Sequence, residues 1–349
     1  MTMPLLAAPV GVREADLTDA REVAAIDRFV VAMPGATPFH LPAWSRAVAR
    51  GCGQRARYLV AERADGALAG VLPLTEMRSV IFGSALVSCG FAVDGGVLGD
   101  ASEPLASGAW ALAQRLGCPE VELRGGAAPQ GWAVDDASYL GFARNLAADD
   151  DAELLAIPRK QRAEVRRSLG FDLEVVVGNA PALLAEHHRV YAESVRNLGT
   201  PVFPAALFRA VAETMDADVL TIRHAGKAVA SVLSLYFAGT VYPYWGGGTA
   251  AARGLRANDR MYFELMRHAR ARGCTRFDFG RSKTGTGAAS FKKNWGFTPE
   301  PRRYAKRSDS LTRAVNPLNP KYIAMVAAWK RLPLPVANLV GPWLSRGLG

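Results

Sequence analysis

The chain has 349 residues, half of them apolar, which is enough to bury one large core or two smaller ones. A formal net charge of +10 favours anionic partners such as nucleic acid, nucleotide-linked substrates or an anionic membrane surface. Neither the four cysteines nor the five histidines show the spacing of a disulfide framework, a zinc knuckle or another metal site. Because the chain also lacks a leader pattern and a long apolar run, we expect a cytoplasmic protein that does not span the membrane.

The first 150 residues alternate helical and strand patterns, as is typical of a mixed α/β unit. Helices are indicated by apolar residues at helical spacing, and a hairpin by two strand-like runs that flank a turn pair. In chain order we expect a helix within 13–32, a helix at 44–50, a strand at 58–62, a turn at Asp65-Gly66, a strand at 69–77, a loop at 83–99, a helix at 103–116 and a strand at 121–124.

The second half repeats this order from residue 219 onward. We expect strands at 219–224 and 229–237 around an Ala225-Gly226 turn, a strand at 240–245 before the triple glycine 246–248, a helix at 259–272 capped by Asn258, and a strand at 276–279. The pairs Gly117-Cys118 and Gly273-Cys274 follow the corresponding helices, 156 residues apart, and the two hairpin turns are 160 residues apart. Two fused copies of one unit explain this spacing, so we predict an α+β fold built twice.

A basic helix follows the boundary marked by Asp149–Asp151 and Ile157-Pro158. From Arg159 onward it places Arg159, Arg162 and Arg166 on one face at i, i+3 and i+7, with Glu164 as its single acid. The alternative to a functional role is a solvated charged face. Since Glu164 is the only acid in the helix and no acidic segment matches the arginine face, we favour phosphate binding.

The stretch from Phe277 to Phe297 carries the strongest chemical signal. Phe277 and Phe279 share one face of a short strand that we expect to end at Gly280, and a glycine-containing polar run follows. Next come two lysines between large aromatic side chains, in Ser-Phe-Lys-Lys-Asn-Trp-Gly-Phe from Ser290. A lysine against aromatic walls can keep its charge for a developing oxyanion, or lose that charge when it is desolvated. The alternative is a surface turn with solvated lysines.

Several segments, in one order, resemble the FemAB family of tandem GNAT-like acyltransferases, and most closely its branch associated with PEP-CTERM/exosortase polysaccharide clusters. They are Ile157-Pro-Arg-Lys-Gln-Arg-Ala-Glu-Val-Arg-Arg, Tyr191-Ala-Glu-Ser-Val-Arg-Asn-Leu-Gly-Thr-Pro-Val-Phe-Pro, Tyr244-Trp-Gly-Gly, Phe277-Asp-Phe-Gly-Arg-Ser and Ser290-Phe-Lys-Lys-Asn-Trp-Gly-Phe. The resemblance implies two tandem GNAT-like domains with mixed sheets, at 1–150 and 151–310, followed by a basic amphipathic tail at 311–349.

The resemblance also implies transfer of an acyl or aminoacyl group to an amine or hydroxyl, with no tightly bound cofactor. In FemAB-like enzymes the donor is aminoacyl-tRNA and the acceptor is a peptidoglycan precursor. The family's Phe-Lys pair matches Phe291-Lys292, and we expect the ammonium of Lys292 to face a groove formed by the two units. Asp278 has the chemistry of a general base, although pairing with Arg281 or capping a turn explains it as well. Expected substrate-binding residues are Arg162, Arg166, Tyr191, Arg196, Tyr244, Trp245, Arg281, Ser282, Lys283 and Asn294.

One departure concerns the donor. Single-domain GNAT enzymes hold the CoA pyrophosphate on a glycine-rich loop at a helix N-terminus. Here the corresponding segment, Ala252-Arg-Gly-Leu-Arg-Ala-Asn-Asp, loses the glycine spacing and brings in Asp259. Aminoacyl-tRNA is therefore favoured over acyl-CoA. The alternatives are an acyl-CoA-dependent N-acetyltransferase and a non-catalytic GNAT pair that binds an anionic glycan carrier through Tyr242, Tyr244 and Trp245. A general tRNA or DNA binder fits less well.

The tail carries no acid after Asp309. We expect a helix at 321–331, with Tyr322, Met325, Val326 and Trp329 on one face, and a second apolar segment at 336–344 after Pro333 and Pro335. Exclusively positive charge with interfacial tryptophans suits peripheral contact with an anionic inner membrane. The alternative is a helix docked on its own domain.

Overall fold

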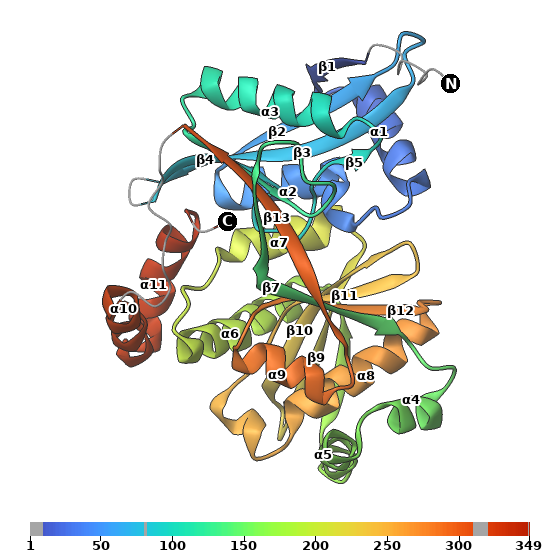
Figure 1. Cartoon of the computed structure of the whole chain (residues 1–349). Helices are drawn as coiled ribbons and strands as arrows, with labels where there is room; N and C mark the ends of the chain where they lie inside the picture. Colours follow the sequence, from blue (N-terminus) through green and yellow to red (C-terminus); the bar gives the residue numbers. More distant parts are fainter. Residues whose placement is uncertain (1–9, 80–81, 310–319, 348) are drawn as a thin grey trace. The chain divides into compact units, whose positions relative to one another are not determined.

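The computed structural model describes residues 10–79, 82–309, 320–347 and 349, which group into two compact units (Figure 1). The first unit falls within 1–136 and 303–312 with Gly349, and the second falls within 137–302 and 313–348. Each unit is a mixed sheet covered by helices. The division into domains at 1–150, 151–310 and 311–349 stays a prediction.

The first unit orders its strands β1-β2-β3-β4-β6-β13, with β5 paired to β3. All neighbours whose register is described are antiparallel except β4 and β6, which are parallel and joined through α3. Its elements are β1 (Gly11–Glu14), α1 (Ala20–Ala32), η1 (Pro38–His40), α2 (Pro42–Cys52), β2 (Arg55–Glu62), β3 (Leu68–Ser79), β4 (Gly83–Ser88), β5 (Leu98–Gly99), α3 (Ser102–Leu116), β6 (Glu120–Arg124) and residues 303–308 of β13 (Pro299–Ser308).

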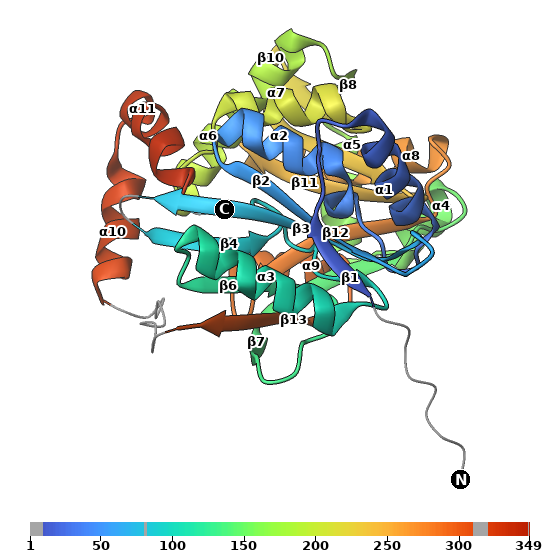
Figure 2. The same cartoon turned by 90° about the horizontal axis from the view of Figure 1, so that it is seen from above.

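Helix α3 lies along the two parallel strands that it connects (Figure 2). Its inner face, which includes Leu105, Ala109 and Leu112, packs on residues of β2, β3 and β6 in one apolar core. The helix ends at Gly117, whose φ of 67° is the left-handed conformation that glycine adopts most readily. This end was expected from the sequence.

The second unit orders its strands β7-β12-β11-β10-β9-β8. Among its strand pairs whose register is described, β11 and β12 are parallel and the others are antiparallel, and α8 joins β11 to β12. Its elements are β7 (Ala133–Asn145, from residue 137), α4 (Asp150–Ala156), α5 (Arg159–Leu169), β8 (Glu174–Gly178), α6 (Pro181–Leu198), α7 (Ala205–Thr214), β9 (Ala217–His224), β10 (Lys227–Phe237), β11 (Thr240–Gly248), η2 (Ala250–Arg253), α8 (Ala257–Ala271), β12 (Arg276–Lys283), α9 (Gly287–Asn294), α10 (Pro320–Arg331) and α11 (Leu334–Ser345).

The two units therefore share an order of hairpin, strand, helix and parallel strand, as the sequence repeat predicts. In the first unit it runs β2-β3-β4-α3-β6, and in the second β9-β10-β11-α8-β12. The predicted α+β architecture with mixed sheets is confirmed. The crossover helix buries one face on the sheet in each unit, which explains why both helices carry apolar residues at helical spacing.

Several sequence expectations were wrong in detail. Residues 83–99 are not a loop throughout, because β4 pairs with both β3 and β6 there. The strand at 276 does not end at Gly280 but continues to Lys283 across a bulge. Asn258 is not the cap of α8, since the helix begins two residues earlier than expected, at Ala257, after the cap residue Arg256, whose φ is 53°. In the tail, Pro333 and Pro335 do not break the chain before residue 336: they begin α11, as proline does at helix N-termini.

Glu153 organises the start of the second unit although its side chain is fully buried. Its carboxylate pairs with Arg144 of β7, accepts the backbone N–H of Ala147 at 2.8 Å, and lies 3.5 Å from a guanidinium nitrogen of Arg270 on α8. Helix α4 is thereby tied to both a strand and the crossover helix. Because two partners are guanidinium groups, the buried carboxylate balances charge that the interior would otherwise leave uncompensated.

We predict that Glu153→Ala lowers the free energy of unfolding by about 3–5 kcal/mol, because it leaves Arg144 and Arg270 without their shared carboxylate. Urea denaturation of the whole chain measures this loss. The control is Asp151→Ala on the exposed side of the same helix, which should cost less than about 1 kcal/mol. Equal losses in the two variants would contradict a stabilising role for the buried carboxylate.

Candidate functional site

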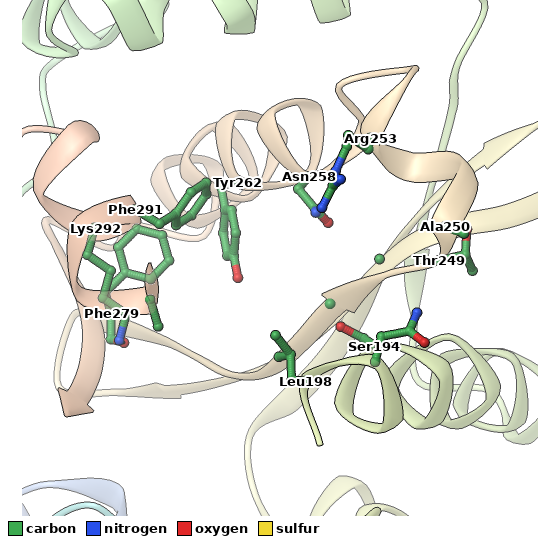
Figure 3. A pocket seen from close by; sticks show the side chains of 14 residues that line it. Ser194, Leu198, Thr249, Ala250, Arg253, Asn258, Tyr262, Phe279, Phe291 and Lys292 are labelled. Atoms are coloured by element: carbon green, nitrogen blue, oxygen red, sulfur yellow. The ribbon is translucent and has the colours of Figure 1, made fainter. Parts of the chain in front are cut away.

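A cavity of about 660 Å³ opens in the second unit where β11 and β12 separate (Figure 3). The parallel ladder between the two strands is described only at Thr240–Val241 with Arg276–Phe277, so the strands diverge toward their carboxyl ends. The cavity is lined by Ser194, Asn197 and Leu198 of α6, Gly247 and Gly248 of β11, Thr249 to Arg253 in part, Asn258 and Tyr262 of α8, Phe279 of β12, and Ala288, Phe291 and Lys292 of α9.

The triple glycine makes room for this cavity. A Cβ on Gly246 would lie 3.2 Å from the hydroxyl oxygen of Tyr262, and a Cβ on Gly247 would lie 2.3 Å from Oγ of Ser194. On Gly248 it would lie 2.6 Å from Oδ1 of Asn258. Side chains from α6 and α8 therefore rest directly on the bare strand. Glycine is needed here for close approach and not for an unusual φ.

One end of the cavity is aromatic. The ring of Tyr262 meets the rings of Phe279 and Phe291 with centroids 4.7 and 5.7 Å apart, the first pair edge to face. The hydroxyl of Tyr262 points into the open space (Figure 3). Burial, with a further contribution from the carboxylate of Asp259, raises the pKa of Tyr262 to about 12, so the phenol stays protonated at neutral pH. It can donate a hydrogen bond to a ligand there.

Lys292 lies at this aromatic end with its nitrogen held by backbone carbonyls. Nζ donates to the carbonyl oxygens of Phe279 at 2.6 Å, Arg281 at 2.9 Å and Gly280 at 3.4 Å. It also lies 5.4 and 5.6 Å from the ring centroids of Phe142 and Phe279. Three acceptors around one nitrogen match the three N–H bonds of an ammonium group.

These carbonyls belong to a bulge in β12. Between Asp278 and Arg281 the pairing with β7 slips, so that Phe279 and Gly280 stand opposite Phe142 alone. Gly280 has a φ of 66°, and its N–H is capped by Oδ1 of Asp278 at 2.7 Å. The bulge turns three successive carbonyls toward Lys292. The lysine and the bulge therefore hold each other in place.

Burial lowers the pKa of Lys292 to about 7, with smaller contributions from the guanidinium groups of Arg302 and Arg281. The carboxylate of Asp278 acts in the opposite direction. Near neutral pH the side chain therefore exists in both protonation states. This is the range in which a lysine can serve either as a cation or as a proton acceptor.

The other end of the cavity is polar. Oδ1 of Asn258 is buried and has no hydrogen-bond partner among the described residues, and exposed Arg253 lies beside it (Figure 3). A ligand that enters here meets an acceptor that lacks a donor. Reasoning from the sequence missed Asn258, Arg253, Tyr262 and Ser194. The triple glycine was the available signal, because it marks a strand on which neighbouring side chains lie.

Of the residues expected at the site, Lys292 and Phe291 line this cavity. Arg162 and Arg166 lie elsewhere, in a shallow hollow of about 610 Å³ on α5 with Arg159, Ala163 and Arg167. Within the described part of the chain, Arg159, Arg162 and Arg166 have no ion-pair partner closer than 4.0 Å, whereas Arg167 pairs with Glu164. The predicted arginine face is thus present, but separate from Lys292.

Three other expected binding residues, Tyr191, Tyr244 and Trp245, belong to an aromatic cluster. Tyr191 and Trp245 are buried against Phe208, with ring centroids 5.4 and 4.5 Å from it, and Tyr244 stacks edge-on with Trp245. Stacking of Trp245 on a sugar would require this cluster to open.

The other five expected binding residues lie on α6, β12 and α9. Arg196 donates from Nη1 to the carbonyl oxygen of Lys330 at 3.2 Å, and the guanidinium of Arg281 lies 4.4 Å from the ring centroid of Tyr139. Ser282 is buried and Asn294 is exposed, while Lys283 accepts the hydroxyl of Thr286 at its carbonyl oxygen. None of these five lines the cavity.

Asp278, expected as a catalytic residue, does not line the cavity either. One carboxylate oxygen caps Gly280, and the other lies 3.5 Å from Nη2 of Arg302. The turn-capping alternative describes the carboxylate in this structure, with Arg302 as an ion-pair partner, and a catalytic role for Asp278 stays a prediction. The physical reason is the bulge, whose backbone N–H needs an acceptor.

The described residues contain no group of three or more His, Cys, Asp or Glu side chains arranged to hold a metal ion. No described helix is both long and apolar enough to cross a membrane.

Comparison with known proteins finds a likeness within the second unit. The region 157–293 matches the family model described as Acetyltransferase (GNAT) domain. It contains the cavity residues from Ser194 to Lys292. No curated protein sequence gives a significant match.

Solved structures extend the likeness to both units. FemX aligns with a TM-score of 0.65 at 14% identity, over 84% of this chain and 96% of its own. The C-terminal domain of a putative lysylphosphatidylglycerol synthetase from Agrobacterium fabrum aligns at 0.56 and 14%, over 88% and 95%. A tandem GNAT protein from the clavulanic acid biosynthesis pathway aligns at 0.57 and 11%, over 87% and 100%. The predicted fold of tandem GNAT-like domains is confirmed, and the likeness to FemX fits the FemAB resemblance.

We predict that Gly248→Ala displaces the side chain of Asn258 and reduces the affinity of any ligand that occupies the cavity. The new Cβ would lie 2.6 Å from Oδ1 of Asn258 and 2.7 Å from Cβ of Ala252, closer than van der Waals contact allows. A crystal structure of the variant would show the displacement. Gly254→Ala is the matched control, because its nearest neighbour would be 3.9 Å away. An unmoved Asn258 would contradict this packing argument.

The lowered pKa of Lys292 predicts a pH dependence of stability. Between the folded pKa of about 7 and the unfolded value of 10.5, the unfolded chain binds more protons at this residue. Its contribution to the free energy of unfolding should therefore rise with pH by up to about 1.4 kcal/mol per unit, and it is lost as pH falls through 7. Denaturant unfolding of wild type and Lys292→Met at several pH values measures the difference. A difference that does not change with pH would contradict the lowered pKa.

Proposed function

We propose that this protein is a FemAB-like acyltransferase that moves an activated acyl or aminoacyl group onto an amine or hydroxyl of a cell-envelope or exopolysaccharide precursor. The observation that carries the proposal is the position of Lys292, at the aromatic end of a cavity between two diverging strands of a GNAT domain. The resemblance to the FemAB branch associated with PEP-CTERM clusters supports the precursor class.

In the proposed reaction the acceptor amine or hydroxyl attacks the carbonyl carbon of an activated ester. A C–N or C–O bond forms, the carbonyl oxygen becomes an oxyanion, and collapse of this intermediate breaks the bond to the leaving oxygen. The acceptor loses one proton and the leaving alkoxide gains one. The step that a protein can accelerate most is formation of the oxyanion, because charge develops there in a site that excludes water.

Lys292 is suited to stabilise that oxyanion. Its ammonium group is fixed by the carbonyls of Phe279 and Arg281, while the contact with the carbonyl of Gly280 is long, at 3.4 Å. The third N–H bond can turn to an oxyanion at little cost, because it gives up only this weak contact. One such donor is worth about 2.7–4 kcal/mol in the transition state. The hydroxyl of Tyr262 can supply a second donor from the same wall of the cavity.

The polar end of the cavity, at Asn258 and Arg253, suits an acyl donor that carries an N–H group and a nearby negative charge. The buried Oδ1 of Asn258 can accept from an α-amino or amide N–H, and Arg253 can pair with a phosphate at the rim. Aminoacyl-tRNA satisfies both requirements. The arginine face of α5, formed by Arg159, Arg162 and Arg166, offers further phosphate contacts and favours this donor.

Acyl-CoA is the second candidate donor, because the matched domain is described as an acetyltransferase. The charges at the start of α8 argue against acyl-CoA. Arg256, next to this end, is in an ion pair with Glu164, with a nitrogen–oxygen distance of 2.5 Å. Asp259 follows within the first turn, and burial raises its pKa to about 6. At pH 7 this carboxylate is still mostly charged and would repel a pyrophosphate.

We place the reaction in the cytoplasm, where charged tRNA and activated precursors are available, with no tightly bound cofactor. Peripheral contact of residues 311–349 with the inner membrane would bring the enzyme to a lipid-linked acceptor. A non-catalytic GNAT pair that binds an anionic glycan carrier is the alternative, and it predicts retention of a carrier without a covalent product.

We predict that Lys292→Met reduces kcat by about 100-fold or more while the chain stays folded, because the oxyanion loses its cation. Lys293→Met is the matched control, since the neighbouring lysine is exposed and should be replaceable without effect. Mass spectrometry of acceptor pools incubated with charged tRNA or acyl-CoA measures the product. Equal turnover in both variants would overturn the role of Lys292, and carrier bound without product would favour the binding module.

The pH dependence of the Lys292→Met effect tests whether Lys292 acts as a charged ammonium group or as a neutral general base. If the ammonium form is active, the ratio of wild-type to Lys292→Met rates should fall as pH rises through about 7, where the amine loses its proton. A ratio that rises over this range would show that neutral Lys292 acts as a base instead.

A further inference from the structure

Helix α11 has an inner face of small residues that is docked and an outer face that is apolar. Its inner face is docked: Ala337, Gly341 and Ser345 are buried, and Oγ of Ser345 donates to the carbonyl oxygen of Val202 at 2.9 Å. A Cβ on Gly341 would lie 3.1 Å from the backbone nitrogen of Val202, so the helix packs closely there. The helix therefore has a fixed orientation on the second unit, beside α6 (Figure 2).

The outer face is apolar and uncovered. Val336, Leu339, Val340 and Trp343 follow the spacing i, i+3, i+4 and i+7, and we call them the outer stripe. Their exposed fractions are 43, 80, 37 and 59%, and the value for Leu339 is the highest among the large apolar side chains of the described residues. Since the inner face already anchors the helix, docking on its own unit does not account for these four residues.

The charged residues that flank α11 along the chain have one sign. Lys330 and Arg331 precede α11, Arg346 follows it, and no acid occurs in the sequence after Asp309. An apolar stripe between cationic ends, with a tryptophan in it, is the pattern of a helix that lies in a bilayer interface. At 12 residues, or about 18 Å, α11 is too short to span a bilayer.

We propose that the outer stripe of α11 binds an anionic lipid bilayer, with the helix lying in the plane of the surface. Charge favours this occupant over a second copy of the chain, because pairing two outer stripes would bring like charges together. An anionic headgroup layer instead pairs with Lys330, Arg331 and Arg346, while the stripe enters the acyl boundary. The proposal does not depend on acyl transfer, since binding can be measured without turnover.

The test is flotation of the full chain with phosphatidylcholine vesicles that do or do not contain phosphatidylglycerol. We expect the wild type to float with the anionic vesicles, less at high salt, and to stay behind with phosphatidylcholine alone. The double variant Leu339→Glu with Trp343→Glu should lose about tenfold or more in binding, because both side chains would leave the acyl boundary. Since both are exposed, circular dichroism and Tm should be unchanged.

Leu155→Glu on α4 is the matched control, because Leu155 is 67% exposed on a different helix. It should float like the wild type. Equal flotation of the stripe variant and the wild type would overturn the proposal, as would binding that ignores phosphatidylglycerol. If sedimentation instead shows a wild-type dimer that the stripe variant abolishes, without flotation of either, the outer stripe is a self-interface.

Discussion

The contact between Lys292 and the β12 bulge is the interaction on which the site depends. An ammonium group buried among Phe142, Phe279 and backbone carbonyls is tolerated because each of its N–H bonds has an acceptor. The bulge in turn exposes three carbonyls that pairing in the sheet cannot satisfy. Each feature would be costly alone. Together they place a cation, with a pKa near neutrality, at the end of a cavity.

The cavity itself follows from the crossover geometry that both units share. A helix that joins two parallel strands covers their shared face, and where those strands diverge it leaves a space between them. In the second unit the triple glycine keeps β11 bare, so Ser194, Asn258 and Tyr262 can line the space. The glycines thus contribute to the proposed activity by the side chains that they lack.

The second unit carries positive charge in three different environments. Lys292 is buried, and its desolvation lowers its pKa to about 7, whereas the arginine face of α5 lines a shallow surface hollow. Helix α11 contains no cation itself but is flanked by Lys330 and Arg331 before it and Arg346 after it. The buried cation is proposed to stabilise an oxyanion, and the arginine face is proposed to bind phosphate. The apolar stripe between cations is proposed to bind a lipid surface. The same net charge of +10 therefore supports three different proposed contacts.

Local patterns in the sequence were sufficient for the repeat, the hairpins and the crossover helices, because each depends on spacing within one or two elements. The role expected for Phe291 and Lys292 came from the family resemblance and stays a prediction. The partners of those residues were not predictable. Asp278 was a candidate base with turn capping as the alternative, and its carboxylate accepts the backbone N–H of Gly280 in a bulge two residues later. Asn258 was expected to cap a helix, yet it faces a cavity created by a strand ten residues earlier. Such roles depend on which backbone groups a distant strand leaves unsatisfied, and only the tertiary structure decides that.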